Sequence, residues 1–173
     1  MREAFFQWAL ERAKKGQVGW LNAVFRRILP FNAPHGIRVK SFADGAVSVR
    51  LPARRSNRNH LNGMHACAIA TACEFCSGLA VLSRFNMKSY RLIMNKLDVE
   101  YVRRPARGHC LAMAEVSGDL SGEIEEMMRT SEDGAARFQM ESRLVDSEGN
   151  TAAIARVHWH VKPWSEVTFK PTA

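Results

Sequence analysis

The chain has 173 residues, of which 46% are hydrophobic and 24% are charged, and its formal net charge at pH 7 is +8. This size and composition are those of one ordinary globular domain, and they exclude an intrinsically disordered protein. The positive charge favours anionic partners such as phosphorylated cofactors, nucleic acids or acidic membrane surfaces, without choosing among them. We therefore expect residues 1–173 to form a single domain.

Two short basic helices are predicted at the start of the chain, over residues 2–15 and 18–29, where apolar residues recur at helical spacing until Pro30. We interpret residues 1–30 as a helical extension that covers the domain. The first residues lack an apolar stretch with a small-residue cleavage site, so we predict no export signal.

A β-hairpin is predicted over residues 36–51, because apolar residues alternate on both sides of the turn Asp44–Gly45. A buried helix follows over residues 64–82 and is apolar or small-sided on all faces. It is almost long enough to span a membrane, but Glu74 and the small side chains favour a packed core helix. We therefore predict no stable membrane insertion.

The apolar period then returns to two, which predicts four more strands, and a short helix is predicted over residues 124–129. The strand signals are Leu97, Val99 and Tyr101; Leu111 and Met113; Phe138, Met140, Ser142 and Leu144; and Ala153, Ala155, Val157, Trp159 and Val161. The predicted fold is α+β, with a curved antiparallel sheet of about six strands wrapped around one central helix. The many small residues of that helix indicate that its backbone lies close to the sheet.

The cysteines are spaced neither as a zinc site nor as a disulfide framework, which favours reduced thiols and a cytoplasmic location. They lie at positions 67, 73, 76 and 110. His158 and His160 share one face of the last strand, but no carboxylate or cysteine completes a metal site beside them. We predict no metal.

Glu74 is the one charged residue in the predicted buried helix. An unpaired charge in a protein core is costly, so this carboxylate needs a partner, a proton or a catalytic role. Carboxylates in such environments cluster at active sites. The alternative is a core residue that is bonded to an arginine or to a helix end.

The segment Asn59-His-Leu-Asn-Gly-Met-His65, with Glu74 nine positions after His65, resembles the hotdog-fold acyl-CoA thioesterases. Their pattern is Asn, then His-Gly-Gly six positions later, then Asp or Glu nine positions after that His. With residues 99–108, the chain is most similar to uncharacterised thioesterase-like (DUF4442-type) domains. The resemblance implies a hotdog fold and hydrolysis of an acyl thioester.

The helix geometry indicates that the predicted site needs two subunits. Nine helical residues rise about 13 Å, so His65 and Glu74 cannot act on one atom within one chain. A two-fold dimer with side-by-side helices brings one helix start to the middle of the other helix. The resemblance also implies this homodimer, and a dimer of dimers is left open.

The chemistry of thioester hydrolysis assigns a role to each of these residues. Glu74 is the predicted base or nucleophile, and the N–H of Ala66 is the predicted oxyanion donor at the helix start. The family's two glycines are Ala66 and Cys67 here, but the backbone N–H is retained. Asn59, preferred over Asn62, orients water or thioester. His65 fixes the turn by hydrogen bonding rather than moving protons.

Arginines around Pro105 are the predicted contacts for the phosphates of coenzyme A, with a solvated basic edge as the alternative. They are Arg103, Arg104 and Arg107, with Arg54, Arg55 and Arg58 as a second group. Asn95 lies where relatives place a second polar helper. Coenzyme A enters as part of the substrate, and no other cofactor is predicted.

The sequence therefore predicts a thioesterase that acts on an acyl-CoA or a related small-molecule thioester. A non-catalytic protein that binds acyl-CoA or lipid on the same fold is the alternative, and a hydratase or dehydratase is a related possibility. A nucleic-acid-binding domain rests on charge alone, without a recognised motif, so no nucleic-acid partner is predicted.

Overall fold

The structure is a computed structural model that describes residues 2–85 and 88–168. Its helices and strands alternate along the chain in an order that the sequence periodicity largely indicates. They are α1 (Arg2–Lys14), α2 (Val18–Ile28), β1 (Arg38–Phe42), β2 (Ala46–Leu51), α3 (Ala66–Arg84), β3 (Tyr90–Tyr101), β4 (Cys110–Glu115), α4 (Leu120–Thr130), β5 (Ala136–Val145) and β6 (Thr151–Pro163). Three short 3₁₀ turns are Pro30–Asn32, Arg55–Asn57 and Trp164–Glu166.

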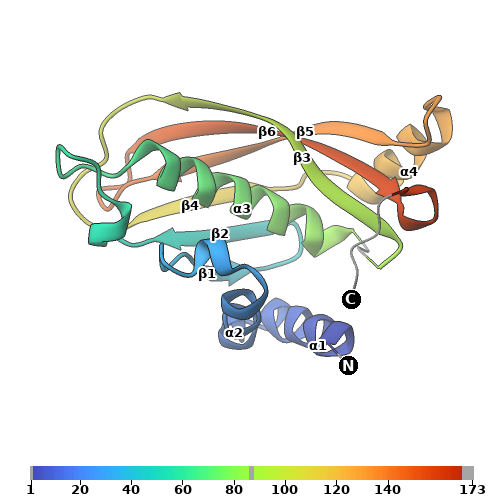
Figure 1. The fold of residues 1–173 in the computed structure, drawn as a ribbon, viewed down its shortest axis with the longest axis horizontal. Coiled ribbons are helices and arrows are strands. Elements are labelled where there is room, and N and C mark those ends of the chain that lie inside the picture. The colour runs from blue at the N-terminus through green and yellow to red at the C-terminus, as the bar shows by residue number, and fades with distance from the viewer. Residues whose placement is uncertain (1, 86–87, 169–173) are drawn as a thin grey trace.

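In the described part of the chain, the strands form one antiparallel sheet of six strands in the order β1-β2-β4-β5-β6-β3. The sheet curves around α3, which lies along its concave side, while α1 and α2 lie beside β1 (Figure 1). The predicted α+β architecture with one central helix is confirmed. The edges of the sheet are β1 and β3.

The backbone of α3 lies close to the sheet because its sheet-facing residues are small. A Cβ added to Gly78 would lie 3.1 Å from the ring of Trp159, so a larger residue there requires the ring to move. The neighbouring Ser77 accepts a hydrogen bond of 2.8 Å from the indole N–H of Trp159. By length and apolarity α3 could cross a membrane, but 67% of it is buried inside the protein, which makes it a core helix.

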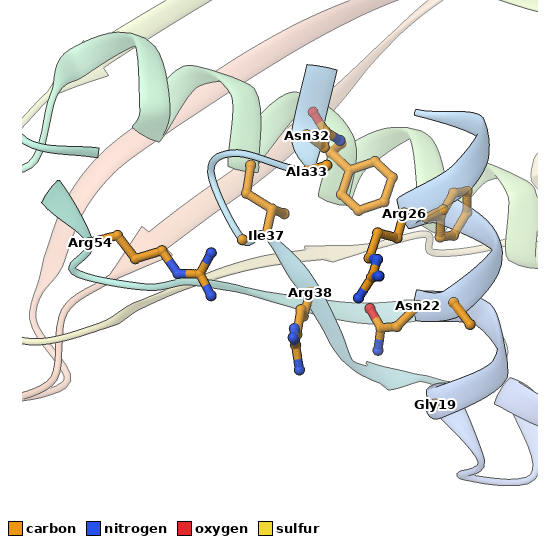
Figure 2. Close-up of a pocket in the computed structure, with 12 residues that line it drawn as sticks. Gly19, Asn22, Arg26, Asn32, Ala33, Ile37, Arg38 and Arg54 are labelled. Carbon is orange, nitrogen blue, oxygen red and sulfur yellow. The ribbon is translucent and has the colours of Figure 1, made fainter. Parts of the chain in front are cut away.

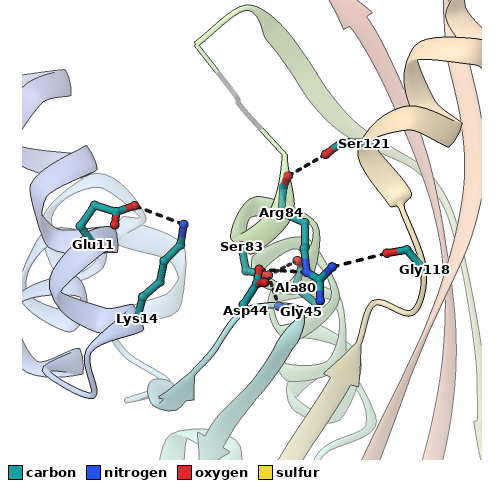
Figure 3. Close-up of polar contacts among 9 residues, drawn as sticks. All are labelled: Glu11, Lys14, Asp44, Gly45, Ala80, Ser83, Arg84, Gly118 and Ser121. Atoms are coloured by element: carbon teal, nitrogen blue, oxygen red, sulfur yellow. Dashed lines mark hydrogen bonds and ion pairs between the residues drawn. The ribbon is translucent and has the colours of Figure 1, made fainter.

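The C-terminal end of α3 is fixed by polar contacts to the turn between β1 and β2 and to α4 (Figure 3). Arg84 forms an ion pair of 2.9 Å with Asp44, and the hydroxyl of Ser121 donates to the carbonyl of Arg84. The buried hydroxyl of Ser83 accepts a hydrogen bond of 3.0 Å from the N–H of Gly45. These contacts hold the helix in register with the sheet.

The strand β3 begins at Tyr90, five residues before the predicted start at about residue 95. The pairing of β3 with β6 shifts register between Met94 and Lys96, which leaves Asn95 in a bulge. A bulge inserts one residue and interrupts the alternation of buried and exposed side chains. The alternation of apolar and polar residues is therefore evident in the sequence only after the bulge.

The strand β4 was predicted from the alternating apolar residues Leu111 and Met113, but its core-facing residues are the ones between them. Met113 is 40% exposed, whereas Ala112 is fully buried. The buried residues of β4 are Cys110, Ala112 and Ala114. Small side chains are needed on this strand because α3 packs directly against it. The helix predicted over residues 124–129 is the longer α4.

The N-terminal helices pack on the domain through α2, whose side chains Leu21, Val24 and Phe25 are buried. Phe25 meets the ring of Phe75 on α3 edge-on, at 5.1 Å between centroids. Phe6 on α1 meets Phe25 in the same way at 5.9 Å. This row of aromatic rings joins the extension to the middle of α3, close to Glu74.

Candidate functional site

Glu74 lies in the middle of α3, half-buried, and its carboxylate has no hydrogen bond or ion pair within residues 2–85 and 88–168. Burial alone raises the pKa of Glu74 from 4.5 to about 7. The alternative that a core arginine or a helix end satisfies this carboxylate therefore finds no support in the described chain. A carboxylate with a pKa near 7 can exchange protons at physiological pH.

Glu74 borders a cavity of about 650 Å³ between the N-terminal helices, α3 and β3, which we call the apolar groove. The groove is defined by Phe6, Phe25, Ile28 and Leu29 of the extension, by Glu74, Phe75, Leu79 and Leu82 of α3, and by Leu92, Trp159 and Trp164. Arg91, the other charged residue at the groove, makes no ion pair with Glu74 within the residues that the structure describes. The groove has the size and lining of a site for an apolar ligand.

The start of α3 is built by His65, which is the N-cap of the helix and accepts a hydrogen bond of 3.1 Å from Cys67 N–H on its Nδ1 atom. The N–H of Ala66 has no acceptor among the described residues. The carbonyl of Ala66 accepts a hydrogen bond of 3.1 Å from the hydroxyl of Tyr101 on β3. An exposed backbone N–H is thus available at the positive end of the helix dipole.

Asn59 organises the loop before α3. Its side-chain oxygen accepts hydrogen bonds from the N–H groups of Leu61 and Gly63, at 3.0 and 3.1 Å. Asn62 has a positive φ of 56° and serves as a turn residue in this loop. Asn59 and Ala66 both line a cavity of about 300 Å³ at the start of α3, whereas Asn62 does not.

The predicted catalytic residues fall into two places within one chain. Asn59, His65 and Ala66 gather at the start of α3, and Glu74 lies eight residues after Ala66, a helical rise of about 12 Å. One chain therefore does not bring Glu74 to the free N–H of Ala66.

Four of the six predicted phosphate-binding arginines divide between two cavities near the start of α3, whereas Arg54 lines another cavity, beside α2 and β1, and Arg55 lines none of them. Arg104 and Arg107 line a cavity of about 680 Å³ together with Arg58. Arg103 lines the cavity of about 300 Å³, to which Arg104 also contributes. Arg104 is held in place by a hydrogen bond of 3.0 Å to the carbonyl of Leu61. The cavity that Ala66 lines is therefore bordered by two arginines, Arg103 and Arg104, and the neighbouring cavity by three, Arg58, Arg104 and Arg107.

Asn95 lies apart from these groups. It is exposed in the bulge of β3 and lines neither the apolar groove nor the cavities at the start of α3. Tyr101 was not predicted as a candidate site residue, because the sequence marks it only as one of the alternating apolar residues of a strand. The position of β3 alongside α3 gives Tyr101 its contact with Ala66.

The buried cysteine Cys73 and the histidine His158 show no sign of a second reactive centre among the described residues. Burial raises the pKa of Cys73 to about 12, so its thiol is neutral and unreactive. The ring of His158 is hydrogen-bonded to Asp98 at 3.1 Å, and Asp98 also pairs with Lys96. Among the described residues, no group of three or more histidine, cysteine or acidic side chains could hold a metal ion.

Comparisons with known proteins identify the family and the fold of the chain. The family model described as a domain of unknown function (DUF4442) matches residues 19–161. No curated protein matches the chain. A Pseudomonas aeruginosa protein of unknown function, named a probable thioesterase, is 24% identical over 82% of this chain and 93% of that chain, with a TM-score of 0.73.

Two further solved structures share the fold at lower identity. A thioesterase from Haemophilus influenzae is 12% identical over 88% of this chain and 94% of its own, with a TM-score of 0.70. A Bacillus halodurans protein solved with CoA is 19% identical over 76% of this chain and 74% of its own, with a TM-score of 0.58. The chain therefore belongs to the DUF4442 family and has the hotdog fold.

Proposed function

We propose that the chain is an intracellular homodimeric thioesterase that hydrolyses an acyl-CoA or a related acyl thioester. In this proposal, Glu74 of one subunit acts as base or nucleophile, and the N–H of Ala66 of the other subunit stabilises the oxyanion. Each copy of the chain carries both groups, but they lie at separate places along α3.

The observation that carries the proposal is the unpaired carboxylate of Glu74 at the apolar groove. Burial raises its pKa to about 7, which suits a group that must take a proton from water near neutral pH. A buried carboxylate without a partner destabilises the fold, so a function explains it better than stability does. The adjacent groove suits an acyl chain.

The free N–H of Ala66 supports the second half of the proposed chemistry. Attack on a thioester produces an anionic tetrahedral intermediate, which needs fixed hydrogen-bond donors. The first N–H of a helix of 19 residues has no partner in its own helix, and the helix dipole adds positive potential there. Asn59 and Tyr101 line the same opening.

The edge strand β3 supports the proposed dimer. It has 12 residues, it pairs with β6 on one side only, and its exposed side chains include Ile93, Met94 and Tyr101. A long apolar edge strand is a template for pairing with another chain. Two-fold pairing of β3 strands would set the two α3 helices beside each other, with the start of each near the other's Glu74.

Substitution of Glu74 by glutamine tests the proposal. On a panel of acyl-CoA substrates, we expect Glu74→Gln to lower kcat/KM about 1000-fold with an unchanged circular dichroism spectrum. Glu115→Gln, at an exposed position at the end of β4, is the matched control and should keep wild-type activity. Equal turnover by wild type and Glu74→Gln would end the catalytic assignment.

The replacement of the family's two glycines by Ala66 and Cys67 favours a second candidate, a non-catalytic acyl-CoA or lipid-binding protein. Tight acyl-CoA binding without turnover by the wild type, across the same panel, would establish this alternative. Failure to bind any acyl ligand would contradict both candidates.

A further inference from the structure

Three arginines line a separate cavity of about 450 Å³, which we call the arginine pocket, and one of them, Arg54, is among the arginines that the sequence predicts to contact phosphate. They come from different elements: Arg26 from α2, Arg38 from β1, and Arg54 from the segment after β2. Figure 2 shows Arg38 between the other two guanidinium groups. Asn22 and Asn32 are further polar lining residues, and none of the described residues that line the pocket is acidic.

The charges of the arginine pocket are not neutralised within the described residues 2–85 and 88–168. Arg26, Arg38 and Arg54 have no side-chain hydrogen bond or ion pair there. Arg38 also lies directly opposite Arg50 in the pairing of β1 with β2. Like charges at directly opposed positions destabilise a sheet, and a bound anion would relieve this repulsion.

The walls of the arginine pocket are held in place by specific contacts. The side chain of Asn22 donates to the carbonyl of Val39 at 2.9 Å and accepts from the N–H of Val39 at 2.8 Å, which ties α2 to β1. Arg54 lies against Gly36, where an added Cβ would be 2.5 Å from the Cζ atom of Arg54. Gly36 has a positive φ of 62° and lets the guanidinium lie over the backbone.

The arginine pocket shares a wall with the apolar groove. Phe25 and Phe75 line both cavities, and their rings meet edge-on at 5.1 Å. A cationic cavity and an apolar cavity therefore lie on two sides of one aromatic pair. This juxtaposition suits a ligand that has an anionic group at one end and an apolar portion at the other.

We infer that Arg26, Arg38 and Arg54 bind a phosphate group of an amphipathic ligand whose apolar part occupies the apolar groove. Arginine offers paired N–H donors that match phosphate oxygens, and three guanidinium groups can balance the charge of a phosphate dianion. Two ligand sources share this chemistry, namely the coenzyme A portion of an acyl thioester and a phosphorylated lipid. The inference concerns binding alone, so loss of the hydrolytic role of Glu74 would leave it standing.

Calorimetric titration with decyl phosphate, below its micelle-forming concentration, tests the inference. We expect Arg38→Met to weaken binding of decyl phosphate at least about tenfold, the loss of one charge-assisted contact. Arg27→Met is the matched control, because Arg27 is exposed beside Arg26 on α2 but does not line the arginine pocket. The uncharged decyl glucoside should bind wild type and both variants equally.

Titration with coenzyme A distinguishes the two sources. If Arg38→Met weakens the binding of coenzyme A and decyl phosphate alike, the phosphate belongs to the substrate's coenzyme A. If only decyl phosphate is affected, the ligand is a phosphorylated lipid. The inference is overturned if neither probe binds the wild type, if Arg38→Met binds both probes as the wild type does, or if Arg27→Met loses as much affinity as Arg38→Met.

Discussion

Polar groups at the C-terminal end of α3 have bonding partners, whereas two at its start and middle have none among the described residues. At the C-terminal end, Arg84 pairs with Asp44, and the buried hydroxyl of Ser83 is hydrogen-bonded on both sides (Figure 3). At the start and in the middle, the N–H of Ala66 and the carboxylate of Glu74 have no partner among the described residues. The satisfied groups hold the helix on the sheet, whereas the unsatisfied groups are the ones to which we assign the proposed reaction.

Removal of the unsatisfied N–H should give the largest effect. Ala66→Pro deletes this donor at the first helical position, where proline is tolerated, and His65 before it is already extended at ψ 135°. We expect kcat for acyl-CoA hydrolysis to fall about 100- to 1000-fold with little change in Tm.

Ala66→Ser keeps the N–H and is the control for the size of the side chain. It should retain most of the wild-type activity. A wild-type kcat in Ala66→Pro would show that this end of α3 plays no part in the reaction.

The unsatisfied carboxylate should cost stability at high pH. The pKa of Glu74 is raised from 4.5 to about 7 by burial, so the folded state holds its proton longer than the unfolded state does. The free energy of unfolding is therefore unaffected by the ionisation of Glu74 below pH 4.5 and falls as the pH rises to about 7. The total loss is up to about 3 kcal/mol.

Urea denaturation of wild type and Glu74→Gln at pH 4.5 and pH 8 measures this loss, because glutamine does not ionise. The advantage of the variant in free energy of unfolding should grow between the two pH values. An advantage that is the same at both would mean that Glu74 is not held in a desolvated site.

At the satisfied end of α3, substitution should affect stability but not catalysis. Ser83→Ala leaves the N–H of Gly45 without its acceptor, which should lower the free energy of unfolding by about 1–2 kcal/mol. The value of kcat should stay at the wild-type level under conditions where the variant is folded. A large fall in kcat would remove the distinction between the two ends.

Much of the fold was predictable from sequence because turns and apolar periods are local signals. The hairpin around Asp44–Gly45 and the long small-sided helix fold where these signals predict. The true start of β3 at Tyr90 was not predictable, because the bulge at Asn95 breaks the period. The buried face of β4 was also not predictable, because its small residues carry a weaker apolar signal than Leu111 and Met113.

The candidate site was only partly predictable. The separation of His65 and Glu74 was predictable, because helix geometry alone places two residues at this spacing too far apart to act together within one chain. Arg54 was predicted to contact phosphate, but its grouping with Arg26 and Arg38 was not predictable, because the three come from separate elements that only the tertiary fold brings together. Local sequence signals do not report such convergence.

The central claim is that each active site takes Glu74 from one subunit and the N–H of Ala66 from the other. Mixing the two inactive variants Glu74→Gln and Ala66→Pro, with subunit exchange followed by native mass spectrometry, tests it most directly. Each heterodimer then contains one intact site, so activity should recover to about a quarter of the wild-type value at equal mixing. Heterodimers that form but stay inactive would contradict the account.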